Sequence, residues 1–152
     1  MKSILCKALL VLVLSGAGHS ADLTSSGDWV LGVNATNLVA RAGSDLQAKF
    51  ESASGVTTLT ISNATGAWSL RARRSGGQWN GAVAMQVKRT SDGSGSGSNT
   101  GGNAYVDVSG TDSEIFSGSG NRSGISLQFK LTGLTTKVAP ATYLSSVIFT
   151  VQ

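Results

Sequence analysis

Residues 67–90 read AWSLRARRSGGQWNGAVAMQVKRT, and this stretch decides the fold class. Apolar and polar residues alternate on both sides of the glycine pair Gly76-Gly77. Alternation with a period of two is typical of a β-strand that buries one face, because successive side chains of a strand point to opposite sides. The stretch therefore predicts two β-strands, each with one apolar row. The apolar members of the two rows are Trp68, Leu70, Ala72, Trp79, Val83, Met85 and Val87.

A short loop from Ser75 to Gln78 predicts that these two strands form an antiparallel hairpin. A shift of one residue would turn one apolar row to solvent, so the pattern favours a single register. In that register the facing pairs are Arg74 and Trp79, Leu70 and Val83, and Trp68 and Met85.

The polar face of the predicted hairpin carries Arg71, Arg73 and Lys88, which form the main charge cluster of the sequence. Clustered cations attract anions, so this face is a candidate site for an anionic partner such as an anionic polysaccharide. The alternative is a solvated sheet face, since cationic side chains on strands also discourage edge-to-edge aggregation.

The rest of the chain after residue 21 continues the same pattern and lacks a sustained helical period. Short alternating segments separated by Gly, Ser and Asn turns are typical of β-sandwiches. We predict one all-β domain over residues 21–152, an antiparallel immunoglobulin-like β-sandwich of about seven to nine strands. The expected strands are residues 29–34, 38–41, 46–52, 56–62, 67–74, 79–90, 104–108, 125–132 and 142–152.

Residues 1–20 have the layout of a cleavable signal peptide. Lys2 and Lys7 precede the apolar run from Ala8 to Leu14, and small residues follow, so we expect cleavage after Ser20, with Ala17 as second choice. The run is shorter than the roughly 20 residues that span a bilayer, and no longer run follows. The sequence predicts a secreted protein, extracellular or on the cell surface, that crosses the periplasm if the cell is Gram-negative.

Cleavage would change the chemistry that the chain can perform. Cys6 and His19, the only cysteine and histidine, leave with residues 1–20, and ten Lys and Arg remain against eight Asp and Glu. A Ser-His-Asp triad, a cysteine nucleophile and a structural zinc site all need the lost residue types. The small net charge also gives little support for nucleic-acid binding. We therefore predict a protein that is not an enzyme and has no cofactor or metal.

Three weaker candidates remain, each with a plainer alternative. A glycosidase-like pair could come from Asp107, Asp112 and Glu114, which we interpret as solvated turn residues. Asp92, Asn99 and Asn103 could offer oxygens to calcium, but they belong to the Gly/Ser-rich residues 91–103, which favour a flexible loop. Aromatic residues could stack on sugars or pack in the core, and we favour the core for the tryptophans. The aromatic candidates are Trp29, Trp68, Trp79, Tyr105 and Tyr143.

The C-terminal stretch Ala139-Pro140-Ala141-Thr142-Tyr143 leads into a long strand from Leu144 to Gln152. This arrangement resembles the last strand of bacterial fimbrial subunits and of spore-coat-U-like secreted domains. The resemblance implies an immunoglobulin-like sandwich that lacks one strand and receives it from the N-terminal extension of the next subunit, with a chaperone and usher in assembly.

Two apolar rows are candidate assembly strands, one near each end of the mature chain. Residues 23–28 are expected to be a polar, turn-like leader to the first of them. A strand at an open sheet edge carries unpaired backbone groups that can recruit a neighbour. We hypothesise that residues 29–34 exchange between subunits; the alternative is a plain first strand. The two rows are Trp29, Leu31 and Val33, and Val147, Phe149 and Val151.

These features lead to one functional expectation and one alternative. We expect a non-catalytic, fimbrial-like structural subunit of a bacterial surface appendage, which associates with itself or with other surface subunits by strand pairing. The alternative is a secreted module that binds a carbohydrate or another cell-surface ligand.

Overall fold

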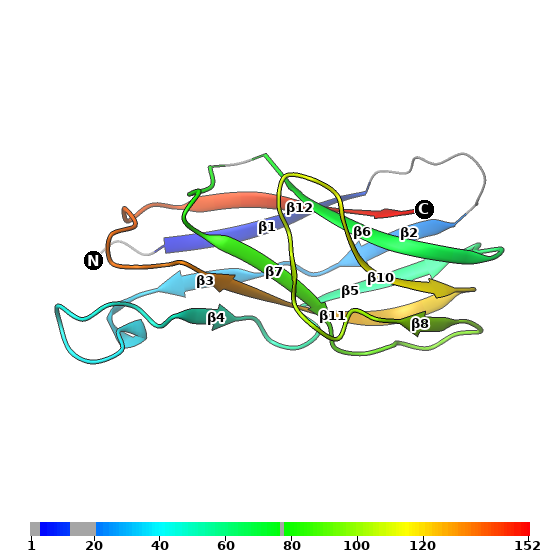
Figure 1. Ribbon diagram of the computed structural model, residues 1–152, viewed down its shortest axis with the longest axis horizontal. Helices are drawn as coiled ribbons and strands as arrows, with labels where there is room; N and C mark the ends of the chain where they lie inside the picture. The colour runs from blue at the N-terminus through cyan, green and yellow to red at the C-terminus, as the bar shows by residue number, and fades with distance from the viewer. Residues whose placement is uncertain (1–3, 13–20, 77) are drawn as a thin grey trace.

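The computed structural model describes residues 4–12, 21–76 and 78–152, and these form a β-sandwich, as the sequence predicted. Its two sheets of strands run along the long axis of the molecule (Figure 1). Sheet A has the order β3 (Val30–Val33), β1 (Ile4–Leu12), β12 (Tyr143–Val151), β6 (Ala67–Ser75), β10 (Ser113–Ser119) and β8 (Ser98–Thr100). Sheet B has the order β2 (Asp22–Ser26), β5 (Thr57–Ser62), β11 (Arg122–Thr132), β7 (Ala84–Arg89) and β9 (Val106–Asp107), with β4 (Lys49–Glu51) also paired to β11.

Neighbouring strands are antiparallel except for β1 and β12, which run parallel. A single short 3-10 helix, Ala35–Asn37, is the only helical element in the described ranges, and no described helix is long and apolar enough to cross a membrane.

The core lies between the sheets and is built from alternate residues of the long strands. Burial alternates along β5, β6, β7 and β11, which matches the apolar rows of the sequence. Trp29 stacks on Phe129 with ring centroids 6.5 Å apart, and Trp68 meets Phe116 edge-on at 6.0 Å. The prediction that tryptophans pack in the core is therefore confirmed for Trp29 and Trp68, which are both buried.

The predicted hairpin of residues 67–90 is wrong. Strand β6 belongs to sheet A and pairs with β10 and β12, whereas β7 belongs to sheet B and pairs with β11 and β9. The connection carries the chain across the sandwich, where Trp79 donates its indole N–H to the Val83 carbonyl at 2.8 Å and lies under the Arg74 guanidinium. Both arrangements bury the same apolar rows, so the alternation could not distinguish them.

Three other expectations differ from the structure. Residues 23–28, expected as a polar leader, include most of strand β2, and Leu23 is almost fully buried. Strand β10 was not predicted because a bulge between Glu114 and Phe116 breaks its alternation, which buries both Ile115 and Phe116. Residues 38–41 form no strand, only an isolated bridge from Leu38 to Leu46. A short edge strand such as β2 needs few apolar residues, so its alternation of apolar and polar residues is a weak signal in the sequence.

Part of the predicted signal peptide lies inside sheet A. Residues 4–12, which overlap its apolar run, form β1 between β3 and β12; the other residues of 1–20 lie outside the described part. An uninterrupted apolar run suits a signal peptide, and it also suits a central strand that is covered on both faces.

Candidate functional site

The strand position between β3 and β12, which we call the acceptor position, is the most distinctive feature of the sandwich. Strand β1 fills it, with seven residue pairs to β12 from Cys6 opposite Tyr143 to Leu12 opposite Phe149. On its other side β1 forms four antiparallel pairs with β3, from Ile4 opposite Val33 to Lys7 opposite Val30. In the described part of the chain, β3 has no other strand partner.

Both predicted assembly strands flank the acceptor position. Trp29 precedes β3, and Val33 ends it; both are buried in the core of their own sandwich. On β12, Val147 and Phe149 are buried to 1% exposure, while Leu31 and Val151 are partly buried against the same core. The sequence identified the two rows, but not that one strand position lies between them. Both the exchanging strand and the plain strand bury this row in a monomer, so the choice between them stays a prediction.

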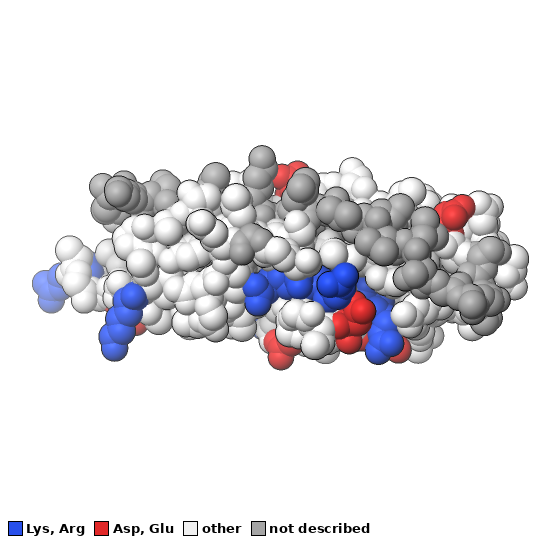
Figure 2. Space-filling model, turned by 90° about the horizontal axis from the view of Figure 1, so that it is seen from above, with Lys and Arg blue, Asp and Glu red and all other residues white. Residues whose placement is uncertain are grey.

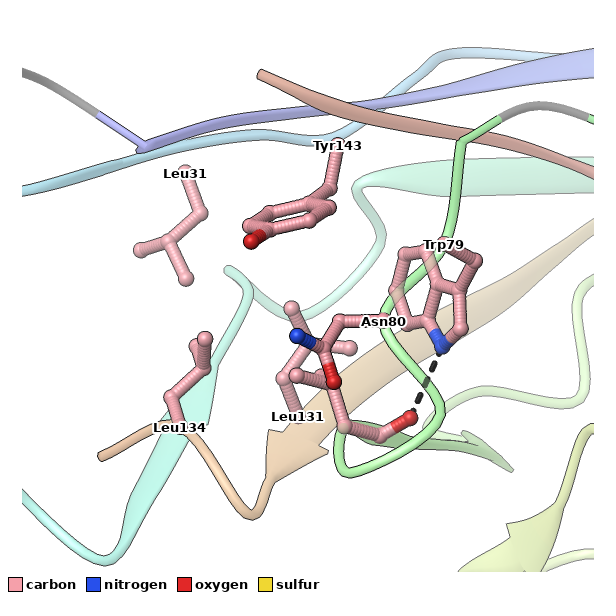
Figure 3. A pocket seen from close by; sticks show the side chains of 7 residues that line it. Leu31, Trp79, Asn80, Leu131, Leu134 and Tyr143 are labelled. Atoms are coloured by element: carbon pink, nitrogen blue, oxygen red, sulfur yellow. Dashed lines mark hydrogen bonds between the residues drawn. The ribbon is translucent and has the colours of Figure 1, made fainter. Parts of the chain in front are cut away.

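A small apolar hollow opens beside one end of the acceptor position (Figure 3). Leu31 and Tyr143 line it and are also the two residues that pair with the Cys6 position of β1. The Tyr143 hydroxyl donates to the Ala139 carbonyl at 2.6 Å, so its hydrogen bond is satisfied outside the hollow. The hollow therefore offers an apolar surface next to the position that Cys6 occupies in β1. The remaining lining residues are Trp79, Asn80, Val83, Leu131 and Leu134.

Ser145 is a polar exception in the apolar row of β12. It is 3% exposed, and its hydroxyl oxygen has no hydrogen-bond partner among the described residues. It stands opposite Ala8 of β1, a residue type with no hydrogen-bonding side chain. A buried hydroxyl without a partner costs about 1–3 kcal/mol, so a strand with a polar residue at this rung would suit the acceptor position better than β1 does.

The predicted basic face does not exist as one surface, because its members lie on different sheets. Arg71 and Arg73 are on β6 in sheet A, and Lys88 is on β7 in sheet B. The cluster depended on the hairpin, and it is corrected together with the hairpin.

The arginines of sheet A have acidic neighbours. Arg73 lies 3.5 Å from the Asp112 carboxylate, and Arg71 stands opposite Glu114 on β10. Figure 2 shows basic and acidic side chains intermingled on the face seen from above. The positive charge of Arg73 is thus partly balanced, while Arg71 forms no ion pair with a described carboxylate.

Lys88 lies near a second lysine, Lys130 of β11, and the ammonium groups of both lie over the same aromatic ring, that of Tyr105. The ammonium groups lie 4.7 Å and 4.0 Å from the centroid of Tyr105. Burial raises the pKa of the Tyr105 hydroxyl, and the negative charge of Glu51 raises it further, so the ring stays neutral. Neither lysine forms an ion pair with a described carboxylate, although Lys130 stands opposite Glu51 of β4. The alternation gave no sign of this Lys-Tyr-Lys cluster, because β7, β11 and the residue before β9 meet only in the fold.

The Gly/Ser-rich residues 91–103, predicted as a flexible loop, are held by two buried arginines. Arg122 donates from all three guanidinium nitrogens to backbone carbonyls of the loop, at 2.7 to 3.3 Å. Arg89 donates to the Gly101 carbonyl and pairs with the Asp92 carboxylate. Burial lowers the pKa of Arg89, and the charge of Arg122 lowers it further. The carbonyls that Arg122 contacts belong to Asp92, Gly93, Gly95 and Gly97.

The weaker candidates of the sequence are not brought together. Asp107 lies on sheet B, where Gln86 donates to its carboxylate, whereas Asp112 and Glu114 lie on the side of sheet A. Asp92, the acidic member of the calcium candidates, is paired with Arg89. The described residues contain no cluster of three side chains of the kinds that commonly hold a metal ion.

Comparison with known proteins adds no relative: no protein-family model matches the chain, and no curated protein matches it.

We predict that Arg122→Gln destabilises the protein by about 3 kcal/mol, because several loop carbonyls lose a charged donor inside the protein. Urea unfolding measures this loss, and the exposed Arg41→Gln is the matched control, with a change of at most about 0.5 kcal/mol. Hydrogen exchange should also accelerate at the amides of Ser94 and Ser123, which bond to each other's carbonyls at the loop base. Unchanged stability and exchange would contradict the role given to Arg122.

Proposed function

We propose that the mature protein, residues 21–152, is a secreted, non-catalytic structural subunit of a bacterial surface appendage, fimbrial in character, whose sandwich is completed by a strand from another subunit. One observation carries the proposal: the strand that fills the acceptor position comes from the predicted signal peptide.

Cleavage after Ser20 would empty the acceptor position. The edge of β12 would lose its seven pairs with β1, and β3 would lose its strand partner. Unpaired backbone groups at a long sheet edge recruit another strand, and Val147 and Phe149 beneath that edge would lose part of their cover. Addition of a strand corrects both defects at once, which is the physical basis of assembly by β-augmentation.

The occupant in the structure indicates what kind of strand fits. It is an extended, nine-residue segment, apolar apart from Lys7 and running parallel to β12. A segment of this chemistry is insoluble alone and gains from burial between two strands. The C-terminal resemblance to fimbrial subunits supports the same function independently of β1.

We predict that a peptide with the sequence of residues 4–12, carrying a solubilising lysine tail and Cys6→Ser, binds and stabilises the mature chain. Its unfolding midpoint should rise with peptide concentration, as expected for a ligand that binds only the folded state. Amides of residues 143–149 and 30–33 should gain protection from hydrogen exchange. The matched control is the same peptide with Leu9→Pro, because proline removes an N–H and fits poorly in a central strand.

The opposite result would be a mature chain whose β12 amides are already protected without peptide and whose midpoint does not respond to it. That result would mean that β3 or another segment closes the edge within one molecule, and the proposal would fail.

We predict that Ala8→Ser in this peptide tightens its binding about fivefold, because a new hydrogen bond to Ser145 contributes about 1 kcal/mol. Titration calorimetry measures the two dissociation constants. The gain should disappear in the Ser145→Ala chain, because that chain has no hydroxyl to bond with the new serine. The four combinations of peptide and chain form a double-mutant cycle that isolates the Ser–Ser interaction. An equal gain in both chains would show that the serine acts without Ser145.

A second candidate function rests on the Lys-Tyr-Lys cluster of Tyr105, Lys88 and Lys130. Two ammonium groups held over one aromatic ring suit an acidic sugar, whose carboxylate or sulfate could pair with the lysines. The cluster replaces the basic face that the sequence predicted and supports the alternative of an anionic polysaccharide ligand.

We predict that Lys88→Gln with Lys130→Gln abolishes salt-sensitive retention on an immobilised anionic polysaccharide. The matched control is Arg71→Gln with Arg73→Gln, which should change retention little because these arginines lie on β6 of sheet A, away from the cluster. Solvent-facing substitutions should each alter stability by no more than about 0.5 kcal/mol, so unfolding midpoints serve as a check. Equal retention of the lysine variant and the unsubstituted protein would remove this candidate.

A further inference from the structure

The mature chain has a position that can receive a strand, and its own strands are committed elsewhere. We infer that residues 21–152 act as a strand acceptor only, so that the strand comes from a different protein and the mature chain does not polymerise by itself through strand donation. The inference rests on the proposed function and adds what kind of molecule the partner is.

The N-terminal segment of the mature chain is already part of sheet B. With cleavage after Ser20 the chain begins at Ala21, which is buried, and β2 follows at Asp22 with five pairs to β5. Leu23 is 1% exposed, and Asn63 donates to the Asp22 carboxylate at 2.5 Å. Donation of this segment to a neighbour would therefore open the edge of sheet B and expose a core leucine.

The next segment, which includes the predicted exchangeable residues 29–34, is also fixed. Gly27 has a φ of +97°, and a Cβ there would overlap the Val56 carbonyl; its own carbonyl accepts from the Thr57 hydroxyl at 3.2 Å. Trp29 stacks on Phe129 in the core. Donation of this segment would withdraw Trp29 from that stack.

Strand β3 also forms the far wall of the acceptor position. Its four pairs with β1 mean that any incoming strand is held between β3 and β12. A subunit that gave β3 to a neighbour would dismantle its own acceptor position. Strand β3 cannot be donated to a neighbour and also form the wall of the acceptor position in its own subunit.

The remaining described segments of the mature chain are tied as well. At the C-terminal end, the Gln152 amide and carbonyl both bond to Ser69 of β6. The stretch between β3 and β4 is closed by the Leu38 to Leu46 bridge, and residues 91–103 are held by Arg122. No described segment of the mature chain is therefore both free and as long as β1.

These constraints define the partner. It is a different polypeptide with an unpaired, extended and predominantly apolar segment of about the length of β1, positioned so that it can enter a sheet edge. Because the described part of the mature chain has one such position and gives no strand in return, we expect a one-to-one complex and not a homopolymer.

The experiment uses engineered disulfides, because the mature chain contains no cysteine of its own. Ser146→Cys places a thiol on the rung of β12 that pairs with Leu9 of β1. The peptide of residues 4–12 with Cys6→Ser and Leu9→Cys should be trapped on this chain in a one-to-one disulfide complex. Two further chains combine Ser146→Cys with Thr24→Cys on β2 or with Val30→Cys on β3, and each is oxidised without peptide.

The outcomes separate the two levels of the proposal. Trapped peptide together with monomeric double-cysteine chains supports an acceptor-only protein, and light scattering of the unsubstituted mature chain should then give a monomer mass. A ladder of disulfide-linked oligomers from either double-cysteine chain would overturn the inference but leave the proposed function standing. Failure to trap the peptide would overturn both.

Discussion

The backbone of β12 must be paired on both of its edges, and the architecture of sheet A depends on this requirement. One edge is satisfied by β6, and the other by β1 in the acceptor position. The core-facing row of β12 includes Val147 and Phe149, which are buried at the centre of the sandwich. Because β3 reaches sheet A only through β1, the same pairing also joins residues 30–33 to that sheet.

A second constraint closes the opposite part of the sandwich. Arg122 and Arg89 turn the carbonyls of the Gly/Ser-rich residues 91–103 inward, so a stretch without an apolar core of its own becomes ordered. The loop needs glycine because its backbone runs against the backbone of neighbouring residues; a Cβ at Gly97 would overlap the Ser119 carbonyl. Gly93 and Gly95 have the same kind of contact, with the carbonyls of Ser123 and Asn121.

The two candidate functions occupy different sheets and therefore separate physically. The acceptor position belongs to sheet A, between β3 and β12, whereas the Lys-Tyr-Lys cluster lies on strands of sheet B. Occupation of one does not require a change in the other. Under the two proposals, a strand bound through sheet A would leave the cluster on sheet B available to a ligand.

The sequence by itself determined the fold class, the inward and outward faces of the long strands, and the two apolar rows that flank the acceptor position, because alternation is a local property of a strand. Only the tertiary structure decided which strands pair, since backbone hydrogen bonds between distant segments leave no mark on residue type. For that reason β6 and β7 could be taken for a hairpin, and Arg71, Arg73 and Lys88 for one face. For the same reason the sequence could not show that one strand position lies between β3 and β12, because β1, β3 and β12 are neighbours only in the folded sheet.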